Sequence, residues 1–274
     1  SGLGLSLDWA PLWGGQSRRR LSLPGYPFQR SRYFIEPGKI AASQNVAPML
    51  HRSDDAADWG WQKIWRPRET GGPLAAELSG LAPQDWLIFT DAGGVQARLA
   101  DRLRSAGQRV VTVRAGDRPS GFGTDKVTLA AELVREGYDL LIADLSARGR
   151  MPARILHGWL LDGGSGPRPG SDLFQQHMEQ GFWSLFWLSQ SLIEAGPSGP
   201  LQITAFTTGA ASVAGEGISF PQKAAIDGVL QVLPRELPGV SCAQLDVTLP
   251  LENEDLLLEE ALSAPLSGQA ALRA

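Results

Sequence analysis

Cysteine is almost absent from this chain, which has one, Cys242, among 274 residues. A single cysteine excludes an internal disulfide and any metal site built from two or more thiolates. Cys242 falls in an apolar run that is typical of a strand. We therefore expect it to be a small buried hydrophobic side chain.

Long hydrophobic runs and strong net charge are also lacking. No apolar stretch approaches the length of a membrane span, and the amino terminus lacks the basic segment and apolar core of a signal peptide. The formal net charge of -4 gives no general attraction to nucleic acid or anionic membranes. The short basic cluster from Arg18 to Arg20 does not change this, and we expect a cytoplasmic globular protein.

Tyrosine is scarce, and its three positions are Tyr26, Tyr33 and Tyr138. A short-chain reductase needs a phenol on the helix after its fifth strand, with a lysine that assists proton donation. That helix contains Lys223 but no tyrosine. We therefore predict that Lys223 is a surface lysine near a helix N-terminus.

The remaining candidates for chemistry are scattered. His51, His157 and His177 have no partners at metal-ligand spacing, so we predict structural roles for them. Asp144 and Asp162 follow predicted strands, where capping of a turn is the commoner role. The G-x-S-x-G elbow of serine hydrolases and the G-x-x-x-x-G-K-[ST] phosphate loop are both missing.

An α/β pattern begins after Asp85. Residues 86–90 form an apolar run typical of a buried strand, residues 95–106 have helical periodicity and end at Gly107, and residues 109–113 form a second apolar run. Strand, helix and strand within about thirty residues make a βαβ unit, which pairs its strands in parallel.

The turn of this unit lacks the G-x-G-x-x-G sequence that lets a backbone approach a dinucleotide pyrophosphate. Only Gly93 and Gly94 remain, and Asp91 places a carboxylate where a phosphate would have to approach. We therefore predict that the chain binds no cofactor at this degenerate turn.

The alternation continues to the end of the chain and predicts a doubly wound parallel sheet covered on both faces by helices. The expected helices are 124–135, 171–195, 221–233 and 251–262, and the expected strands are 138–143, 155–161, 201–207 and 241–247.

The helix expected over 171–195 is apolar around much of its circumference. Ser171 is its predicted N-cap, and the predicted core stripe is Phe174, Met178, Phe182, Leu185, Leu188 and Leu192. Trp183 and Trp187 fall one turn apart on a neighbouring face, which is either an interface or extra intramolecular packing.

The first eighty or so residues differ from the rest. They are rich in proline, glycine, tryptophan and arginine and show little periodicity, as in a linker that packs on its neighbours. Within them, residues 40–58 are the expected mobile piece. Residues 59–65 alternate apolar and polar positions, which predicts a half-buried strand ended by Pro67.

One stretch of this region carries a specific motif. Residues 23–33, LPGYPFQRSRY, resemble the L-P-x-Y-P-F-x-R-x-R-[YF] linker that follows the acyltransferase in modular type I polyketide synthases. The matching positions are Pro24, Tyr26, Pro27, Phe28, Arg30, Arg32 and Tyr33.

The resemblance continues along the chain into the structural, non-catalytic subdomain of a polyketide synthase ketoreductase. Trp61 to Trp65 is similar to its entering strand and residues 157–162, HGWLLD, to its H-x-W-x-L-D stretch. Residues 221–228 continue the match. The resemblance implies a post-acyltransferase linker at 1–58 and, at 59–274, a truncated Rossmann-like fold that binds no cofactor.

The same resemblance implies the surroundings of the segment. Its partners would be the catalytic ketoreductase subdomain, the acyltransferase and the acyl carrier protein of one synthase. NADPH and phosphopantetheine would belong to the parent synthase, and the catalytic residues would lie beyond Ala274, so none is assigned here. The expected docking residues are Trp61, Trp65, Trp183 and Trp187.

Three interpretations stay open at this point. The segment is a scaffold that links the acyltransferase to the ketoreductase region and braces the catalytic subdomain, or a pseudo-ketoreductase that supports another domain such as a methyltransferase. The third is an NADPH-dependent beta-ketoacyl reductase that uses Gly93 and Gly94 unconventionally, which the missing tyrosine disfavours.

Overall fold

The computed structural model divides the chain into two compact units, Ser1–Gln62 and Lys63–Ala274. The structure describes residues 11, 14–15, 54–60, 64–67, 78, 80–130, 135–161, 172–196, 199–213, 215–251, 253–262 and 268–272. In the first unit, the described part contains the short 3₁₀ helix η2 (Ala56–Trp59), whose N-cap is Asp55.

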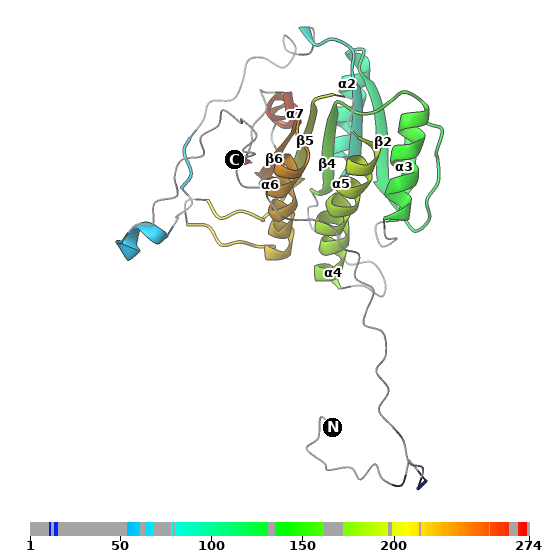
Figure 1. Ribbon diagram of the computed structural model, residues 1–274. Coiled ribbons are helices and arrows are strands. Elements are labelled where there is room, and N and C mark those ends of the chain that lie inside the picture. The colour runs from blue at the N-terminus through cyan, green and yellow to red at the C-terminus, as the bar shows by residue number, and fades with distance from the viewer. Residues whose placement is uncertain are drawn as a thin grey trace, which may run out of the picture. The chain divides into compact units, whose positions relative to one another are not determined.

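The second unit is built on one sheet of seven parallel strands in the order β3-β2-β1-β4-β5-β6-β7 (Figure 1). The strands are β1 (Asp85–Thr90), β2 (Arg109–Ala115), β3 (Lys126–Leu129), β4 (Arg154–Leu160), β5 (Leu201–Thr207), β6 (Val240–Val247) and β7 (Gly268–Leu272). The predicted Rossmann-like, doubly wound sheet is confirmed. The strand order reverses between β1 and β4.

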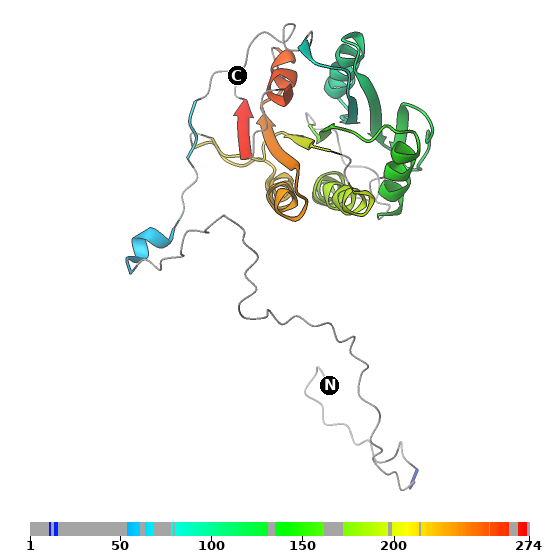
Figure 2. The ribbon, with the colours of Figure 1, turned by 45° about the horizontal axis from the view of Figure 1, so that its top comes forward.

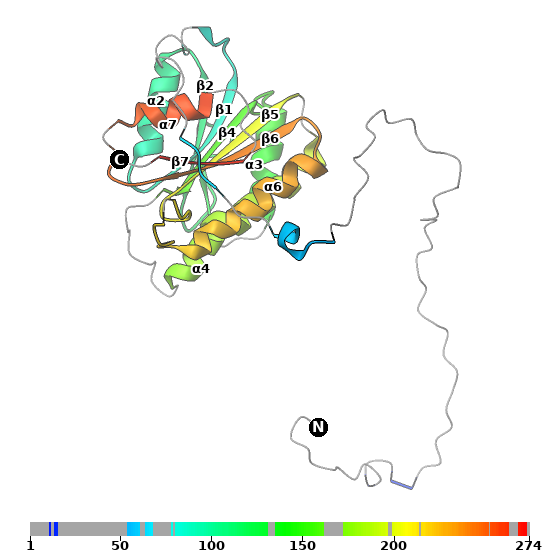
Figure 3. The ribbon, with the colours of Figure 1, turned by 90° about the vertical axis from the view of Figure 1, so that its left-hand side faces the viewer.

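Helices cover both faces of this sheet, as Figures 2 and 3 show from two directions. On one face lie α3 (Glu136–Ala147), α5 (Ser184–Ala195) and α6 (Ile226–Glu236), and on the other lie α2 (Val95–Ser105) and α7 (Asp255–Leu262). Two apolar clusters result, one on each face. Ion pairs of Arg98 with Glu254 and of Arg102 with Asp255 tie α2 to the start of α7.

The central strands are apolar along nearly their whole length because both of their faces are buried. Trp86 and Ile88 of β1 point toward α2, whereas Leu87 and Phe89 point toward α3 and α5. This alternation explains why a continuous apolar run, rather than an alternating one, marks each central strand in the sequence.

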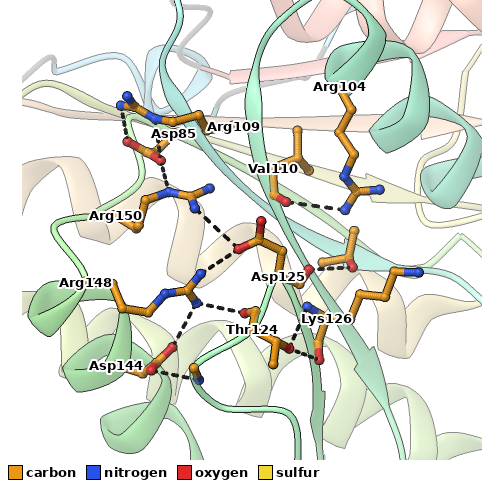
Figure 4. Close-up of polar contacts among 12 residues, drawn as sticks. Asp85, Arg104, Arg109, Val110, Thr124, Asp125, Lys126, Asp144, Arg148 and Arg150 are labelled. Carbon is orange, nitrogen blue, oxygen red and sulfur yellow. Dashed lines mark hydrogen bonds and ion pairs between the residues drawn. The ribbon is translucent and has the colours of Figure 1, made fainter.

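An ion-pair network closes the edge of the sheet where the strands begin (Figure 4). Asp85 accepts hydrogen bonds from Arg109 and Arg150, and Arg150 also contacts Asp125 at 3.3 Å. Arg148 bridges Asp125 at 2.6 Å and the carboxylate of residue 144 at 3.2 Å. Burial alone would raise the pKa of Asp85, but its two arginine partners outweigh this and lower it.

Two predicted elements are wrong. The helix expected over 124–135 contains the strand β3, in which Val127 and Leu129 alternate into the core. The strand expected over 138–143 belongs to the helix α3. Asp144 consequently lies in a helix, where its carboxylate accepts from the Gly123 amide and pairs with an arginine one turn later.

The long helix expected over 171–195 is divided into three parts. These are α4 (Leu173–Met178), the π-helical segment η3 (Glu179–Trp183) and α5. The N-cap is Asp172, whose carboxylate accepts from the Gln175 amide; Ser171 lies outside the described residues. Phe174, expected in the core, is 58% exposed.

The remaining boundaries shift by smaller amounts. The helix expected from residue 221 begins as the 3₁₀ helix η4 (Pro221–Ala225) before α6, and the last helix begins at Asp255 rather than at residue 251. Trp59 ends η2 instead of opening a strand, and it is 58% exposed. Strand β7 has no counterpart among the predicted elements. No helix in the described ranges has the length and apolarity needed to cross a membrane.

Candidate functional site

A hollow of about 450 Å³ opens at the carboxyl ends of β1, β2 and β4. Its walls include Thr90, Asp91, Arg114, Trp159 and Gln176. In doubly wound sheets, ligands bind outside the carboxyl ends of the strands where the strand order reverses. This hollow is therefore the first place to look for a nucleotide site.

Asp91 occupies the backbone donors that a phosphate would need. Its two carboxylate oxygens accept hydrogen bonds from the amide of Gln96 at 2.7 Å and of Val95 at 3.2 Å, the first two residues of α2. A helix N-terminus attracts anions through these free amides and the helix dipole. Here an internal carboxylate already fills that role, and Asp91 is itself buried.

The first turn of α2 also packs directly against β4. A Cβ added to Gly158 would lie 2.3 Å from Cγ of Gln96 and 2.8 Å from the carbonyl oxygen of Phe89. Gln96 is fully buried, and neither polar atom of its side-chain amide has a hydrogen-bond partner. The side chain of Gln96 thus fills the helix-to-strand contact for which dinucleotide sites use glycine.

Lys223 is not the surface lysine predicted from the sequence. It is 0% exposed, and its ammonium donates to Oγ1 of Thr208 at 2.7 Å and to the carbonyl oxygen of Leu160 at 3.1 Å. Nζ also lies 4.6 Å from the ring centre of Phe220. The lysine therefore joins the ends of β4 and β5 to η4.

A second polar network runs across the neighbouring strands. Asp246 of β6 accepts hydrogen bonds from Oγ1 of Thr207 at 2.7 Å and from the amide of Ala210 at 2.9 Å. Gln244 donates to Thr207 and accepts from Gln269 of β7 at 2.8 Å. These side chains hold the loop after β5 and the end of the sheet together, which is a structural role.

The two histidines that the structure describes, His157 and His177, are buried. His157 is completely buried, stacks on Phe89 at 4.8 Å and has Nε2 at 2.9 Å from Oγ of Ser184. Burial lowers the pKa of His157 to about 3, so the imidazole is neutral. His177 is buried beside Gln222, with Nδ1 at 2.8 Å from the amide nitrogen. Among the described residues, no group of three His, Cys, Asp or Glu side chains could hold a metal ion.

An aromatic cluster lies on the helix pair η3 and α5. Phe182, Trp183, Phe186 and Trp187 contact one another with ring centres 4.9 to 6.1 Å apart. Trp183 is 39% exposed, whereas Trp187 packs against the core. The π-helical segment brings Gly181 close to β4, because a Cβ there would lie 2.6 Å from Cδ1 of Leu160.

Several predicted site residues lie outside the described residues. These are the linker motif at Pro24, Tyr26, Pro27, Phe28, Arg30, Arg32 and Tyr33, together with His51, Trp61 and Asp162. Trp65 is described, and its indole nitrogen donates to the carbonyl oxygen of Ser212 at 2.7 Å. It therefore contacts the loop that follows β5.

Comparison with known proteins now defines the family. Residues 85–264, more than half of the chain, match the family model described as beta-ketoacyl synthase-like, N-terminal. This range begins at β1 and ends just after α7.

The similar curated proteins are polyketide synthases. The chain is 31% identical over 131 residues to the phenolphthiocerol synthesis polyketide synthase type I Pks15/1 of Mycobacterium marinum, covering 48% of this chain and 6% of that protein. It is 27% identical over 241 residues to erythronolide synthase EryA3 of Saccharopolyspora erythraea, covering 86% of this chain and 6% of that protein. The chain thus spans only a small fraction of the length of these relatives.

Two solved structures share the fold. One is the adenylation, ketoreductase and pseudo Asub multidomain structure of a keto acid-selecting NRPS module, with TM-score 0.64, 19% identity and coverage of 77% of this chain and 17% of that chain. The other is an N-terminal ketoreductase from the macrolactin assembly line, with TM-score 0.53, 14% identity and coverage of 69% of this chain and 38% of that chain. The chain therefore belongs to the beta-ketoacyl synthase-like, N-terminal family and is a polyketide synthase region with a ketoreductase-like fold.

Proposed function

We propose that this region is the structural subdomain of a ketoreductase, which binds no nicotinamide nucleotide and braces a catalytic subdomain of the same synthase. The acyltransferase and the acyl carrier protein are its further partners. NADPH and phosphopantetheine act on other domains of the synthase, outside this region.

The observation that carries the proposal is the pair of hydrogen bonds from the first two amides of α2 to Asp91. A pyrophosphate at this turn would have to displace a carboxylate from its two amide donors, and the repulsion between the two anions opposes its approach. Gln96 closes the contact between α2 and β4 beneath the turn. The described residues therefore do not fit a dinucleotide.

The sequence after β5 also lacks the tyrosine that a short-chain reductase uses for proton transfer. No tyrosine follows Tyr138 in the sequence, and Tyr138 lies buried in α3, where burial raises the pKa of its phenol. Lys223, the one lysine on η4, holds the ends of β4 and β5. These residues support a subdomain that supplies packing rather than chemistry.

The aromatic cluster of η3 and α5 is the surface that we assign to the catalytic subdomain. Exposed aromatic side chains bury large areas on association and are enriched at the centres of interfaces. Trp183 is the best probe because it is exposed while its neighbour Trp187 contacts the core. Trp183→Ala should weaken association with a separately expressed catalytic half more than it lowers the melting temperature of this chain.

Phe174→Ala is the matched control for this interface. Phe174 is an exposed aromatic residue on α4, outside the ring contacts of the cluster. Its removal should leave association unchanged. If Trp183→Ala instead lowers the melting temperature while association persists, the cluster is part of the core and the docking assignment fails.

Calorimetric titration of the purified chain with NADPH tests the absence of a cofactor site, with an intact ketoreductase as the positive control. No heat of binding up to about millimolar NADPH is the expected result. Saturable micromolar binding would refute the proposal and favour an NADPH-dependent beta-ketoacyl reductase. The alternative of a scaffold for another domain, such as a methyltransferase, predicts the same calorimetry but no association with a ketoreductase catalytic half.

A further inference from the structure

A second hollow, of about 520 Å³, lies on the sheet face that carries α2. It extends over β2 and β3, and it shares only Thr90 and Arg114 with the hollow at the carboxyl ends of the strands. Its walls combine cationic and hydroxyl side chains, namely Arg104, Arg114, Lys126, Thr112, Ser120 and Thr128.

The hollow exists because the helical cover of this face is incomplete. Val111, Val113, Val127 and Leu129 point into the opposite, apolar cluster, so the alternate residues of β2 and β3 point to the α2 side. In the described ranges, α2 and α7 are the helices on that side (Figure 3), and the buried apolar cluster that they form with the sheet includes residues of β1, β2, β4, β5 and β6 but none of β3. The residues that face outward there are polar and at least partly exposed.

Two of these residues, Arg114 and Lys126, place side chains of like charge on neighbouring strands. The register pairs Thr112 with Lys126 and Arg114 with Thr128. Arg114 and Lys126 are therefore diagonal neighbours on one face, with their Cα atoms roughly 8 Å apart from the spacing of the strands and the rise per residue. Without a counter-ion this arrangement is repulsive.

No carboxylate in the described part of the chain neutralises this pair. Arg114 and Lys126 form no ion pair there, whereas most other arginines of the sheet region do, including Arg98, Arg102, Arg109, Arg135, Arg148 and Arg150. Figure 4 shows the Lys126 ammonium pointing away from the network around Asp85 and Asp125. The one acid in the hollow, Asp101, is already paired with Arg104 at 2.8 Å.

The guanidinium of Arg114 is held in place for a ligand. Its Nε donates to Oγ1 of Thr128 at 3.0 Å, and its side chain lines the hollow. A planar guanidinium that presents two N–H groups side by side matches the oxygens of a phosphate or carboxylate. The ammonium of Lys126 adds a second charge for a doubly charged anion.

We propose that this hollow binds a small, polar phosphate monoester, with the phosphate between Arg114 and Lys126 and the rest of the molecule against the threonine and serine hydroxyls. A dianion is favoured over a single carboxylate because two uncompensated cations face the space. The site shares Thr90 and Arg114 with the hollow beside the turn that Asp91 closes, but it does not use the backbone amides of that turn, so it does not depend on the function proposed above.

The test is a ¹H–¹⁵N NMR titration of the chain with inorganic phosphate and with glucose 6-phosphate at about pH 8, where a phosphate monoester is doubly charged. Sodium chloride at matched ionic strength gives the background. Saturable shifts of the amides of residues 112–114 and 126–128 are expected, and the sugar phosphate should bind more tightly than phosphate itself. The double variant Arg114→Gln, Lys126→Gln should weaken binding about tenfold or more.

Arg235→Gln is the matched control, because Arg235 is an exposed arginine on α6 at the opposite face of the sheet. It should bind phosphate as the parent does. If the double variant fails to fold, Lys126→Gln alone should still weaken binding. The proposal would be overturned if the shifts never saturate, if sodium chloride reproduces them, or if they persist in the variants. The proposal would also be overturned if a glutamate-rich peptide gives saturable shifts of these amides while inorganic phosphate and glucose 6-phosphate do not. The hollow would then be a protein-docking face.

Discussion

Gly158→Ala tests how tightly α2 is seated on β4. The new Cβ would lie 2.3 Å from Cγ of Gln96, 2.9 Å from its Cδ and 2.8 Å from the carbonyl oxygen of Phe89. The glutamine side chain can rotate, but the carbonyl belongs to the neighbouring central strand and can move only with it. Overpacking of this kind costs about 1–3 kcal/mol.

For a unit of this size, about 1 kcal/mol changes the melting temperature by about 2–4 °C. We therefore expect Gly158→Ala to melt about 2–12 °C below the parent in a calorimetric or circular dichroism scan. Gly228→Ala is the control, because Gly228 lies in α6 and a Cβ added there would meet no atom within 4 Å. It should instead gain about 0.5–1 kcal/mol from the helix preference of alanine.

A second variant separates the two contacts at this position. Gln96→Ala in the Gly158→Ala background removes the side-chain contact and leaves the backbone one, so it should recover only part of the lost stability. If Gly158→Ala melts within about 1 °C of the parent, α2 does not press on β4 as described. The closure of the contact between α2 and β4 by Gln96 would then be refuted.

Three buried groups give further tests. The pKa of Asp85 is lowered from 3.8 because its arginine partners outweigh burial. Its contribution to the free energy of unfolding is therefore present above about pH 4 and is lost as the pH falls through the folded-state pKa. Asp85→Asn should flatten this acid decline in stability in urea titrations, and an unchanged decline would exclude the ion pairs as its cause. Lys223→Met removes the hydrogen-bond donor to Thr208 and should lower the free energy of unfolding by about 1–3 kcal/mol. Lys126 is exposed, so Lys126→Met should change the free energy of unfolding by less than about 0.5 kcal/mol. Similar losses in the two variants would contradict the difference in burial. Cys242 is 3% exposed, and burial raises the pKa of its thiol to about 12. Mass spectrometry should therefore find iodoacetamide labelling of Cys242 only after denaturation. Rapid labelling of the native chain would contradict its burial.

The central strands could be predicted from the sequence because burial on both faces leaves a continuous apolar run. β1, β2, β4, β5 and β6 all carry such runs, and each was expected within a residue or two of its observed limits. The edge strand β7 has no such run, because its residues are only partly buried. A half-covered strand leaves a weaker pattern.

The exchange of helix and strand around residue 130 has an identifiable cause. Leu140, Leu141 and Ile142 form an apolar run that suggests a strand, but Leu140 is 49% exposed. Burial of Tyr138, Leu141, Ile142 and Leu145 instead follows helical spacing. This helical spacing of apolar residues is present in the sequence, and it extends over more residues than the apolar run at 140–142.

The role of Lys223 had no comparable signal. Lysines are usually exposed, and residues 221–228 give no sign that this one is buried. Its environment is made by the carbonyl of Leu160 and the hydroxyl of Thr208, which come from the ends of two other strands. Only the assembled sheet brings these acceptors together. For Asp91, by contrast, the charge alone predicts that a phosphate is disfavoured at this turn. The structure adds the two backbone amides of α2 that donate hydrogen bonds to its carboxylate.

The strand order has a consequence for synthesis on the ribosome. β1 is hydrogen-bonded to β2 on one side and to β4 on the other, and 63 residues separate Thr90 from Arg154. At about 5–20 residues per second, the buried strand β1 of the nascent chain therefore waits about 3–13 s with one edge unpaired. An unpaired edge can join another chain, so translation speed between these two strands should set how often neighbouring ribosomes produce aggregates of this region.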